Sequence, residues 1–469
     1  MLKRLHSLFL LSLFSILCTL SAVAQITTAS MSGKVVSNGE TVIGATIVAL
    51  HEPSGTTYGT VTNMDGRFDL QGMRTGGPYK VTVSYVGYKS SVYTGVQLQL
   101  GETYSLDVEL KESSEALDEV VVTATRSKFS NEKTGATTNI SSSQITQLPT
   151  VNRSISDIAR LSPYASGMSM AGGDGRSTNF TIDGANFNNN FGLSSNLPGG
   201  GNPISMDAIE EVQVVIAPFD VRQTNFIGGG INAITKSGTN TFKGTAYSYY
   251  RNQDMRGNRI NGEDLGARAD ESKTTYGFTL GGPIIKNKLF FFANFEHEKT
   301  PGEVVKYRAR GAGEEHGGLI SRTYASDLEK VSKHLKEKYG YDTGSYTNFP
   351  ADEKNTKLLA RIDWNITDQH RLSLRYNNTK NTAWQAPNGN SSDTGYRLYG
   401  TYRVGPQSMS YANSLYSMDN KVQSWAADLN SRFSDKISNQ LLFTYTNIED
   451  MRGSNSSPFP FIDIMYTDE

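Results

Sequence analysis

Seven runs of alternating apolar and polar residues in the C-terminal half constrain the fold of this chain more than any other feature. In residues 360–366, alanine, isoleucine and tryptophan share one face of an extended chain, and arginine, aspartate and asparagine share the other. The connections between runs alternate between long and short, at about 22, 4, 55, 3, 40 and 3 residues. Because outer-membrane barrels have long loops at one end and short turns at the other, this alternation predicts strands of a transmembrane β-barrel. The runs cover residues 242–250, 273–283, 288–298, 354–366, 370–379, 420–433 and 437–448.

The predicted barrel, residues 241–469, is incomplete. Single-chain bacterial barrels have an even number of strands, whereas about seven runs are found here. An open sheet edge in lipid leaves backbone N–H and C=O groups without hydrogen bonds, which is energetically costly. We therefore expect the chain of 469 residues to be the N-terminal fragment of a longer protein.

The composition excludes several classes of protein. A formal net charge of −1 argues against a strongly basic nucleic-acid-binding protein, so we expect no nucleic-acid partner. The single cysteine, Cys18, excludes a disulfide scaffold and a cysteine-based zinc module. No run of about 18 apolar residues follows the N-terminus, so we expect no internal transmembrane helix.

The N-terminus has the pattern of a secretory signal peptide at residues 1–24. Basic residues, among them Lys3 and Arg4, precede a mostly apolar stretch at 8–20. Ala22-Val23-Ala24 then supplies the small residues of a cleavage site before Gln25. Cleavage removes Cys18, and the mature protein is expected outside the cytoplasm.

Residues 25–112 are predicted to form a small β-sandwich. Short alternating runs such as 79–85 are separated by turn signals at intervals of about ten residues. The segment resembles the carboxypeptidase-regulatory-like domain, and the resemblance implies no peptidase activity. It rests on residues 33–36, 43–48, 62–68 and 79–88.

The linker at 113–128 carries a short run rich in β-branched residues, which favours an extended conformation. Such a run is either one more strand of a domain or a segment that adds itself to the sheet edge of another protein. It resembles the TonB box of TonB-dependent outer-membrane transporters, which implies TonB, with its inner-membrane energising complex, as a partner. The run consists of Glu119, Val120, Val121, Val122, Thr123 and Ala124.

Residues 129–240 resemble the plug domain of the same transporters. The resemblance rests on residues 180–184, 209–214 and 228–240, and the last stretch, with Phe242-Lys243-Gly244, is most similar to the Oar-like branch. In local terms, Asp183-Gly184 predicts a hairpin turn. The expected fold is therefore mainly β: a small β-sandwich, then an α/β plug domain, then the first strands of an incomplete transmembrane β-barrel.

Enzymatic alternatives find little support in the sequence. His334 and Glu337 have half of a metallocarboxypeptidase zinc pattern, but they lie in a predicted helix that starts with a capping box at Ser326 and stops at Gly340. Lysines crowd this pair and repel a cation. Residues 63–66 resemble part of a calcium loop but lack its outer carboxylates, so a hairpin turn is expected. We expect no enzymatic activity, no catalytic residues, no metal and no cofactor.

The resemblance implies a TonB-dependent receptor or transporter in the cell outer membrane of a Gram-negative bacterium, with its N-terminal domain in the periplasm. Outer-membrane lipids and an unidentified extracellular ligand are the other expected partners. The sequence leaves one alternative open, an outer-membrane adhesin or surface-assembly protein on the same scaffold.

Overall fold

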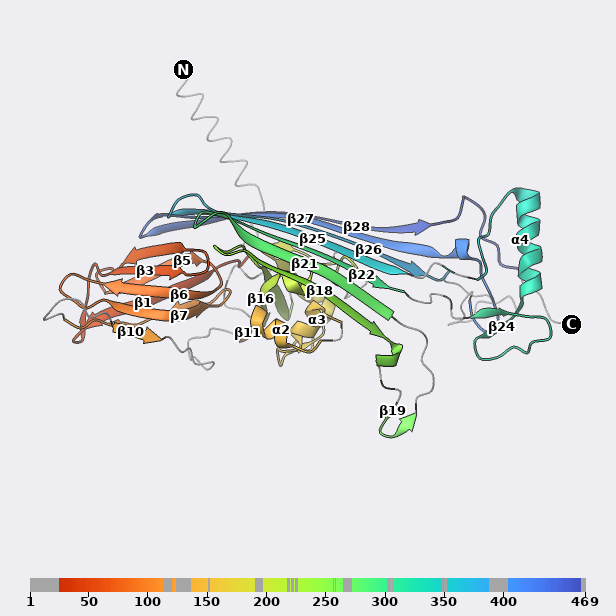
Figure 1. The fold of residues 1–469 in the computed structure, drawn as a ribbon, viewed down its shortest axis with the longest axis horizontal. Coiled ribbons are helices and arrows are strands. Elements are labelled where there is room, and N and C mark those ends of the chain that lie inside the picture. Colours follow the sequence, from red (N-terminus) through yellow and green to blue (C-terminus); the bar gives the residue numbers. More distant parts are fainter. Residues whose placement is uncertain are drawn as a thin grey trace, which may run out of the picture.

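The computed structural model describes residues 25–464 apart from 113–119, 124–135, 151, 190–196, 217–219, 221–222, 224–226, 256, 258, 265–271, 302–304, 306, 348, 350–351 and 388–403. The predicted signal peptide, Glu119 and Ala124 lie outside the described residues. Figure 1 shows a sandwich at one end of a long curved sheet, with a smaller mixed unit against that sheet. None of the described helices is long and apolar enough to cross a membrane.

The N-terminal unit consists of two packed sheets. In one, β1 pairs with β2, β5, β8 and β9; in the other the strand order is β10-β7-β6-β3-β4. Alternate residues face the core between the sheets, where Tyr79, Met31 and Ile47 are fully buried. The strands are β1 (Ala29–Ser37), β2 (Glu40–Thr41), β3 (Thr46–His51), β4 (Thr56–Val61), β5 (Arg67–Met73), β6 (Gly76–Ser84), β7 (Ser91–Leu98), β8 (Thr103–Ser105), β9 (Val108–Glu109) and β10 (Val120–Thr123).

The turn at residues 63–66 differs from its prediction. It joins β4 to β5, which belong to different sheets, so it is a crossing between the two layers and not a hairpin. The Asn63 side chain shapes it, because Oδ1 accepts hydrogen bonds from the backbone N–H groups of Asp65 and Arg67 at 3.0 and 2.9 Å.

The middle unit is a mixed sheet with two short helices. Its strand order is β11-β16-β17-β14-β15, with β14 and β17 parallel. Its core joins apolar residues of the sheet and helices to Phe292, Leu359 and Val422 of the long sheet. The elements are β11 (Ala136–Ser141), α2 (Ser142–Gln147), α3 (Ile155–Ala159), β12 (Ala165–Ser166), β13 (Ser169–Met170), η1 (Gly175–Ser177), β14 (Asn179–Ile182), β15 (Ala185–Asn186), η2 (Met206–Ala208), β16 (Ile209–Ile216) and β17 (Gly229–Thr235).

The C-terminal unit is a seven-stranded antiparallel sheet with the order β18-β21-β22-β25-β26-β27-β28. All seven predicted runs are confirmed as strands, and the sheet is open between β18 and β28, as expected for part of a barrel. Several strands extend beyond the predicted runs at the end with the long connections, where most of their residues are polar. The strands are β18 (Lys243–Asn252), β21 (Ser272–Ile285), β22 (Leu289–Thr300), β25 (Glu353–Asn365), β26 (His370–Gln385), β27 (Tyr416–Ser434) and β28 (Ile437–Ser454).

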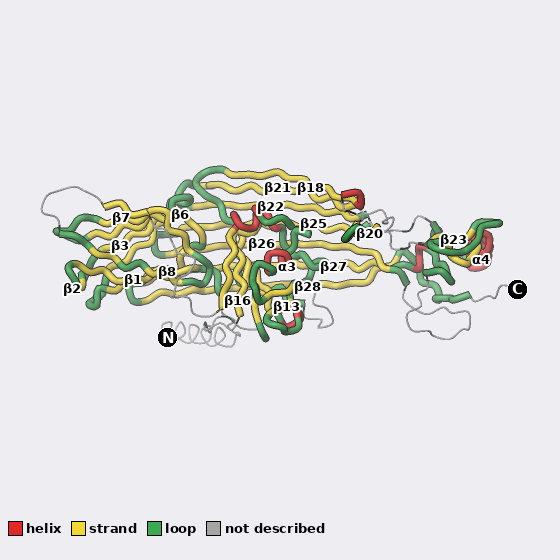
Figure 2. The backbone as a smooth tube through the Cα atoms, turned by 90° about the horizontal axis from the view of Figure 1, so that it is seen from below, coloured by secondary structure: helices red, strands yellow, loops and turns green. Residues whose placement is uncertain are grey.

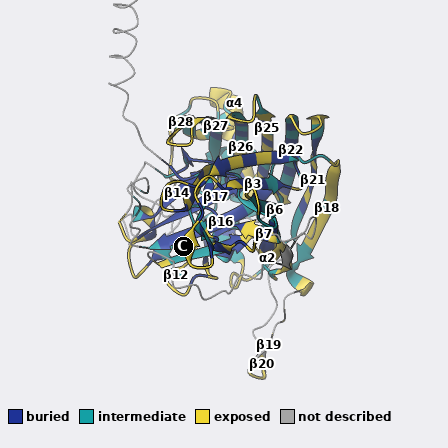
Figure 3. Ribbon diagram, turned by 90° about the vertical axis from the view of Figure 1, so that its left-hand side faces the viewer, coloured by how far each residue is buried: buried dark blue, intermediate teal, exposed yellow. Residues whose placement is uncertain are grey.

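The polarity of this sheet is inverted relative to a soluble protein. On β25, Lys357 is 1% exposed and Asp363 is 0% exposed, whereas Leu358 and Trp364 are 43% and 41% exposed. The face with the buried polar side chains covers the middle unit, which lies against the sheet in Figure 2, and Figure 3 shows buried and more exposed residues alternating along the strands. An outward apolar face with a polar lumen is the arrangement of a membrane barrel, and it identifies the middle unit as a plug inside the lumen.

The long connections carry further elements. The helix α4 (Ala325–Tyr339) ends at Gly340 in the left-handed conformation, as predicted. Its start is not as predicted: the N-cap is Tyr324, so the expected capping box at Ser326 lies inside the helix. The other elements are η3 (Gln253–Met255), β19 (Arg259–Ile260), β20 (Glu263–Asp264), β23 (Arg308–Arg310), β24 (Ile320–Tyr324) and η4 (Ala412–Ser414).

Candidate functional site

A carboxylate on the plug lies between two arginines of the barrel. Asp183 follows β14 in the predicted hairpin turn, with φ of 45°, and its side chain points back to β17. There its oxygens accept hydrogen bonds from the backbone N–H and hydroxyl of Thr235 at 2.9 and 2.6 Å. The sequence predicted the turn, but not that it aims a carboxylate at the barrel wall.

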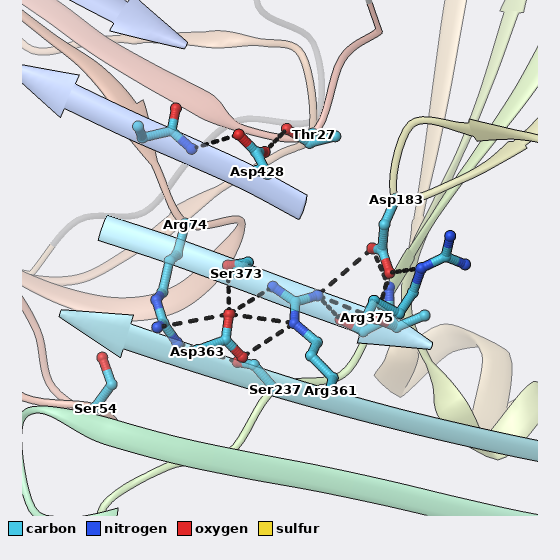
Figure 4. Close-up of polar contacts among 12 residues, drawn as sticks. Thr27, Ser54, Arg74, Asp183, Ser237, Arg361, Asp363, Ser373, Arg375 and Asp428 are labelled. Carbon is cyan, nitrogen blue, oxygen red and sulfur yellow. Dashed lines mark hydrogen bonds and ion pairs between the residues drawn. The ribbon is translucent and has the colours of Figure 1, made fainter. Parts of the chain in front are cut away.

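Arg361 and Arg375 face each other across β25 and β26, with their side chains in the lumen. Like charges opposite one another on a sheet repel, so a counter-charge is needed between them. Asp183 supplies it, at 3.5 Å from Arg361 Nη1 and 3.4 Å from Arg375 Nε. Figure 4 shows this carboxylate reaching both guanidinium groups.

A second carboxylate, Asp363, extends the network toward the N-terminal domain. Arg361 Nη2 lies 2.9 Å from Asp363 Oδ1, and the Ser373 hydroxyl donates a hydrogen bond to the same oxygen at 2.6 Å. From the sandwich, Arg74 Nη2 lies 3.8 Å from Asp363 Oδ1 (Figure 4). Three domains thus contribute charged groups to one network.

This network borders a cavity of about 430 Å³ between the sandwich, the plug and the barrel. Cationic and anionic side chains line it together, so it offers no single sign of charge to a ligand. Among the residues that the structure describes, no three histidine, cysteine or carboxylate side chains are grouped to hold a metal ion. His334 and Glu337 lie on α4, far along the chain from this site, and Glu337 forms an ion pair with Lys333 at 3.8 Å.

A separate contact joins the sandwich to the plug through Glu211 on β16. The Leu100 backbone N–H lies 3.0 and 3.1 Å from the two Glu211 carboxylate oxygens, and Asn139 Nδ2 donates to Oε1 at 2.9 Å. Gln213 Nε2 donates to the Leu100 carbonyl at 2.5 Å, so both backbone groups of Leu100 are bound by the plug. No pattern in the sequence indicates this contact beyond a plug motif at 209–214.

Burial raises the pKa of Glu211 from 4.5 to about 7, with help from the charges of Glu102 and Glu210; the hydrogen bonds from Leu100 and Asn139 act against burial and do not cancel it. A raised pKa in the docked state means that docking takes up a proton. Docking of the sandwich is therefore favoured at low pH, and this advantage is lost as the pH rises through about 7.

We expect the Leu100 amide, corrected for intrinsic exchange, to be more protected from hydrogen exchange at about pH 5.5 than at about pH 8. The control is Glu211→Gln, which keeps one acceptor oxygen and removes the titration, so its protection is expected to be independent of pH. Equal pH dependence in both proteins would refute the role of Glu211.

The predicted TonB box lies at the edge of the sandwich. Its described part, β10, pairs in parallel with β7, from Val120 opposite Ser91 to Thr123 opposite Thr94. β10 is the last strand in the order of its sheet, so its outer edge has no partner strand among the described residues.

A second cavity, of about 840 Å³, lies among the long connections at the opposite end of the barrel sheet. Tyr341 and Phe459 stack there with ring centroids 4.0 Å apart, and Tyr411 donates a hydrogen bond to the Leu328 carbonyl of α4 at 2.7 Å. Its size and its mix of apolar and aromatic walls with a few polar groups are typical of ligand pockets.

Two family models match the chain. The carboxypeptidase regulatory-like domain matches residues 30–111, and an outer membrane beta barrel domain matches residues 234–304. The TonB-dependent transporter Oar of Myxococcus xanthus is 25% identical over 342 residues, which cover 68% of this chain and 30% of Oar. Over about two thirds of its length, the chain is similar to a TonB-dependent transporter.

A second relative of this chain is the TonB-dependent receptor SusC of Bacteroides thetaiotaomicron. It is 32% identical over 137 residues, which cover 29% of this chain and 12% of SusC. The chain thus spans less than a third of the length of either transporter. Among solved structures, the outer membrane transporter YddB from Escherichia coli has a TM-score of 0.45 at 15% identity, covering 68% of this chain and 40% of YddB. The outer membrane beta barrel domain at residues 234–304 indicates that the protein is located in the outer membrane.

Proposed function

We propose that the protein takes up an extracellular ligand across the outer membrane, using energy that TonB delivers from the inner membrane. The observation that carries this proposal is the position of Asp183 between Arg361 and Arg375. A plug held in a polar lumen by ion pairs blocks the lumen at rest, and exchange of those pairs for water allows it to move. The protein acts in this account as a transporter, not as an enzyme.

TonB is the proposed partner of the segment Glu119–Ala124. The parallel pairing of β10 with β7 supports it, because the described part of the segment, Val120–Thr123, is extended and its outer edge ends a sheet. An edge strand presents backbone donors and acceptors to a strand of another protein, which is the chemistry of β-augmentation.

The ligand is proposed to bind at the end with the long connections. The 840 Å³ cavity there offers stacked aromatic rings and apolar walls. Such walls suit a ligand with apolar or aromatic groups, with the hydroxyl and amide groups of the cavity fixing its orientation.

Deletion of residues 119–124 in the full-length protein tests transport against the alternative of an adhesin or surface-assembly protein. Cells with the intact protein are expected to deplete a ligand from a mixture of labelled peptides and sugars, and the deletion should abolish depletion while surface binding of that ligand persists. Two results together would favour the alternative. The deletion strain would show undiminished adhesion or surface assembly, and the intact strain would show no ligand depletion that requires TonB.

The topology provides a further prediction. The turn at 286–288 lies at the same end of the sheet as the sandwich, whereas the connection between β22 and β25 lies at the opposite end. An epitope tag at Gly313, in that connection, should therefore bind antibody on intact cells, and a tag at Asn287 only after permeabilisation. The reverse pattern of labelling would overturn the proposed orientation.

A further inference from the structure

The sandwich is seated on the plug and on the short-turn end of the barrel at several separate points. The Asn240 backbone N–H donates to the Pro53 carbonyl at 2.8 Å, and Asn365 Nδ2 donates to Thr56 Oγ1 at 2.9 Å. Elsewhere in the contact between sandwich and barrel, the Thr27 hydroxyl donates to Asp428 Oδ2 at 2.5 Å. The sandwich therefore contacts the barrel at β25 and β27, and it also contacts the plug, through Leu100 at Glu211 and through Arg74 at Ser237.

The loop that carries Pro53 and Thr56 has a defined shape. His51 Nδ1 lies 2.6 Å from Ser54 Oγ, which lies 2.7 Å from Thr56 Oγ1. Burial and the nearby Arg74 charge lower the pKa of His51 to about 3, so its ring is neutral at physiological pH. A fixed loop of this kind is a rigid docking surface.

Arg74 connects this seat to the charge network. Its Nη1 donates to Ser237 Oγ, just after the last plug strand, at 3.3 Å, and its guanidinium lies 5.6 Å from the centre of the Phe290 ring on β22. Its own backbone is held inside the sandwich, since Tyr79 OH donates to the Arg74 carbonyl at 2.8 Å. The side chain therefore moves with the sandwich, and undocking removes a cation from beside Asp363.

We propose that the N-terminal sandwich is a periplasmic gate, which closes the inner end of the lumen and must undock, withdrawing Arg74, before the plug can leave. This inference rests on the proposed transport function. While the sandwich is docked, it contacts the plug through Leu100 and Arg74 at the short-turn end of the sheet, which is the proposed exit of the plug. A pull on β10 acts first on the sandwich, because β10 is paired with β7 of that domain.

A reversible covalent tether between sandwich and barrel tests the gate. A Cβ atom built on Gly72 of β5 lies 3.6 Å from Asn430 Cβ on β27, within the range of disulfides. Full-length protein with Gly72→Cys and Asn430→Cys forms the tether, and Cys18, in the predicted signal peptide, does not compete. The control pair is Gly87→Cys with Asn430→Cys, because Gly87 also has positive φ and has nothing within 4 Å of its built Cβ.

The first readout is the disulfide itself in isolated outer membranes. We expect nearly complete cross-linking of the 72/430 pair and none of the 87/430 pair. Absence of the 72/430 cross-link would overturn the docked position.

The second readout is plug release in single-molecule pulling on the same protein in a lipid bilayer, through a covalent handle on a peptide tag within 113–119. In the oxidised 72/430 protein, pulling should no longer produce the lengthening of the molecule that accompanies release of the plug. The same molecules should show this lengthening again after reduction. Release of the plug at the same force in the oxidised and the reduced protein would refute the gate. Because the handle is covalent, this outcome does not depend on whether TonB binds β10.

Substitutions at Arg74 provide a measurement without a cross-link. Arg74→Gln is expected to lower the force of the first release step, Arg74→Lys should restore part of it, and Arg67→Gln, an exposed arginine of the same strand β5, should leave it unchanged. Equal first-step forces for the wild type and Arg74→Gln would show that Arg74 does not hold the gate.

Discussion

Replacing Asp183 with alanine is expected to weaken the plug–barrel contact by about 3–5 kcal/mol, the cost of removing one partner from a buried ion pair. Without this carboxylate, the guanidinium groups of Arg361 and Arg375 face each other with side chains only 13% and 2% exposed, and the Thr235 N–H loses its acceptor. The plug should then be released at a lower denaturant concentration, which protease cleavage of the plug in membranes can follow.

The matched control is Asp174→Asn on the same plug domain. Asp174 forms an ion pair with Arg176, but both side chains are about half exposed, at 47% and 49%. Exposed pairs contribute little to stability, so plug release should be almost unchanged. If both variants released the plug at similar denaturant concentrations, the Asp183 network would not be what holds the plug.

Proline at position 121 is expected to weaken binding of the TonB C-terminal domain by about tenfold to a hundredfold. Val121→Pro removes a backbone donor and fixes a backbone angle in the strand, whereas Val121→Ala retains the backbone and should have a much smaller effect. Titration calorimetry on the full-length protein in detergent measures both affinities. The segment is proposed to bind through its main chain, so undiminished affinity of both Val121→Pro and its neighbour Val122→Pro would remove it as the coupling strand.

Val122→Pro distinguishes loss of partner binding from damage to the sandwich. Backbone N–H groups of successive residues point to opposite edges of a strand, so one of the two prolines removes a donor toward β7 and the other toward the partner. The proline that removes the donor toward β7 should lower the midpoint of thermal unfolding of the sandwich without TonB present. If both prolines unfold the sandwich and neither reduces affinity at a temperature where it is folded, β10 is only a structural strand.

Strand periodicity was sufficient to predict the barrel portion of this fold. Alternation places side chains on two faces, and connection lengths distinguish a membrane barrel from a soluble sandwich. Both signals can be read from the sequence alone. The structure shows the alternation in Leu358 and Lys357, adjacent residues with opposite exposure. The start of α4 was mispredicted because a capping box at Ser326 fits local sequence preferences, whereas β24 leads directly into the helix at Tyr324.

The charge network could not be predicted, since its members are distant in sequence. Periodicity indicates that Arg361 faces the lumen but not that Asp183, 178 positions away, meets it there. The same holds for Arg74, which in the sequence is an ordinary polar residue near a glycine-rich turn. Long-range ion pairs depend on how three domains are placed, and no local pattern encodes that placement.

Part of the contact that holds the sandwich is made through its main chain. The plug binds the N–H and C=O of Leu100 and the carbonyl of Pro53, and Arg371 of the barrel donates to the carbonyl of Thr57 at 2.6 Å. Main-chain groups are present whatever the side chains are, so surface loops of the domain are free to diverge in sequence as long as they keep their shape. The domain is therefore exchangeable: a foreign sandwich with the same loop conformations, an arginine at the position of Arg74 and hydroxyls at the positions of Thr27 and Thr56 should dock in its place.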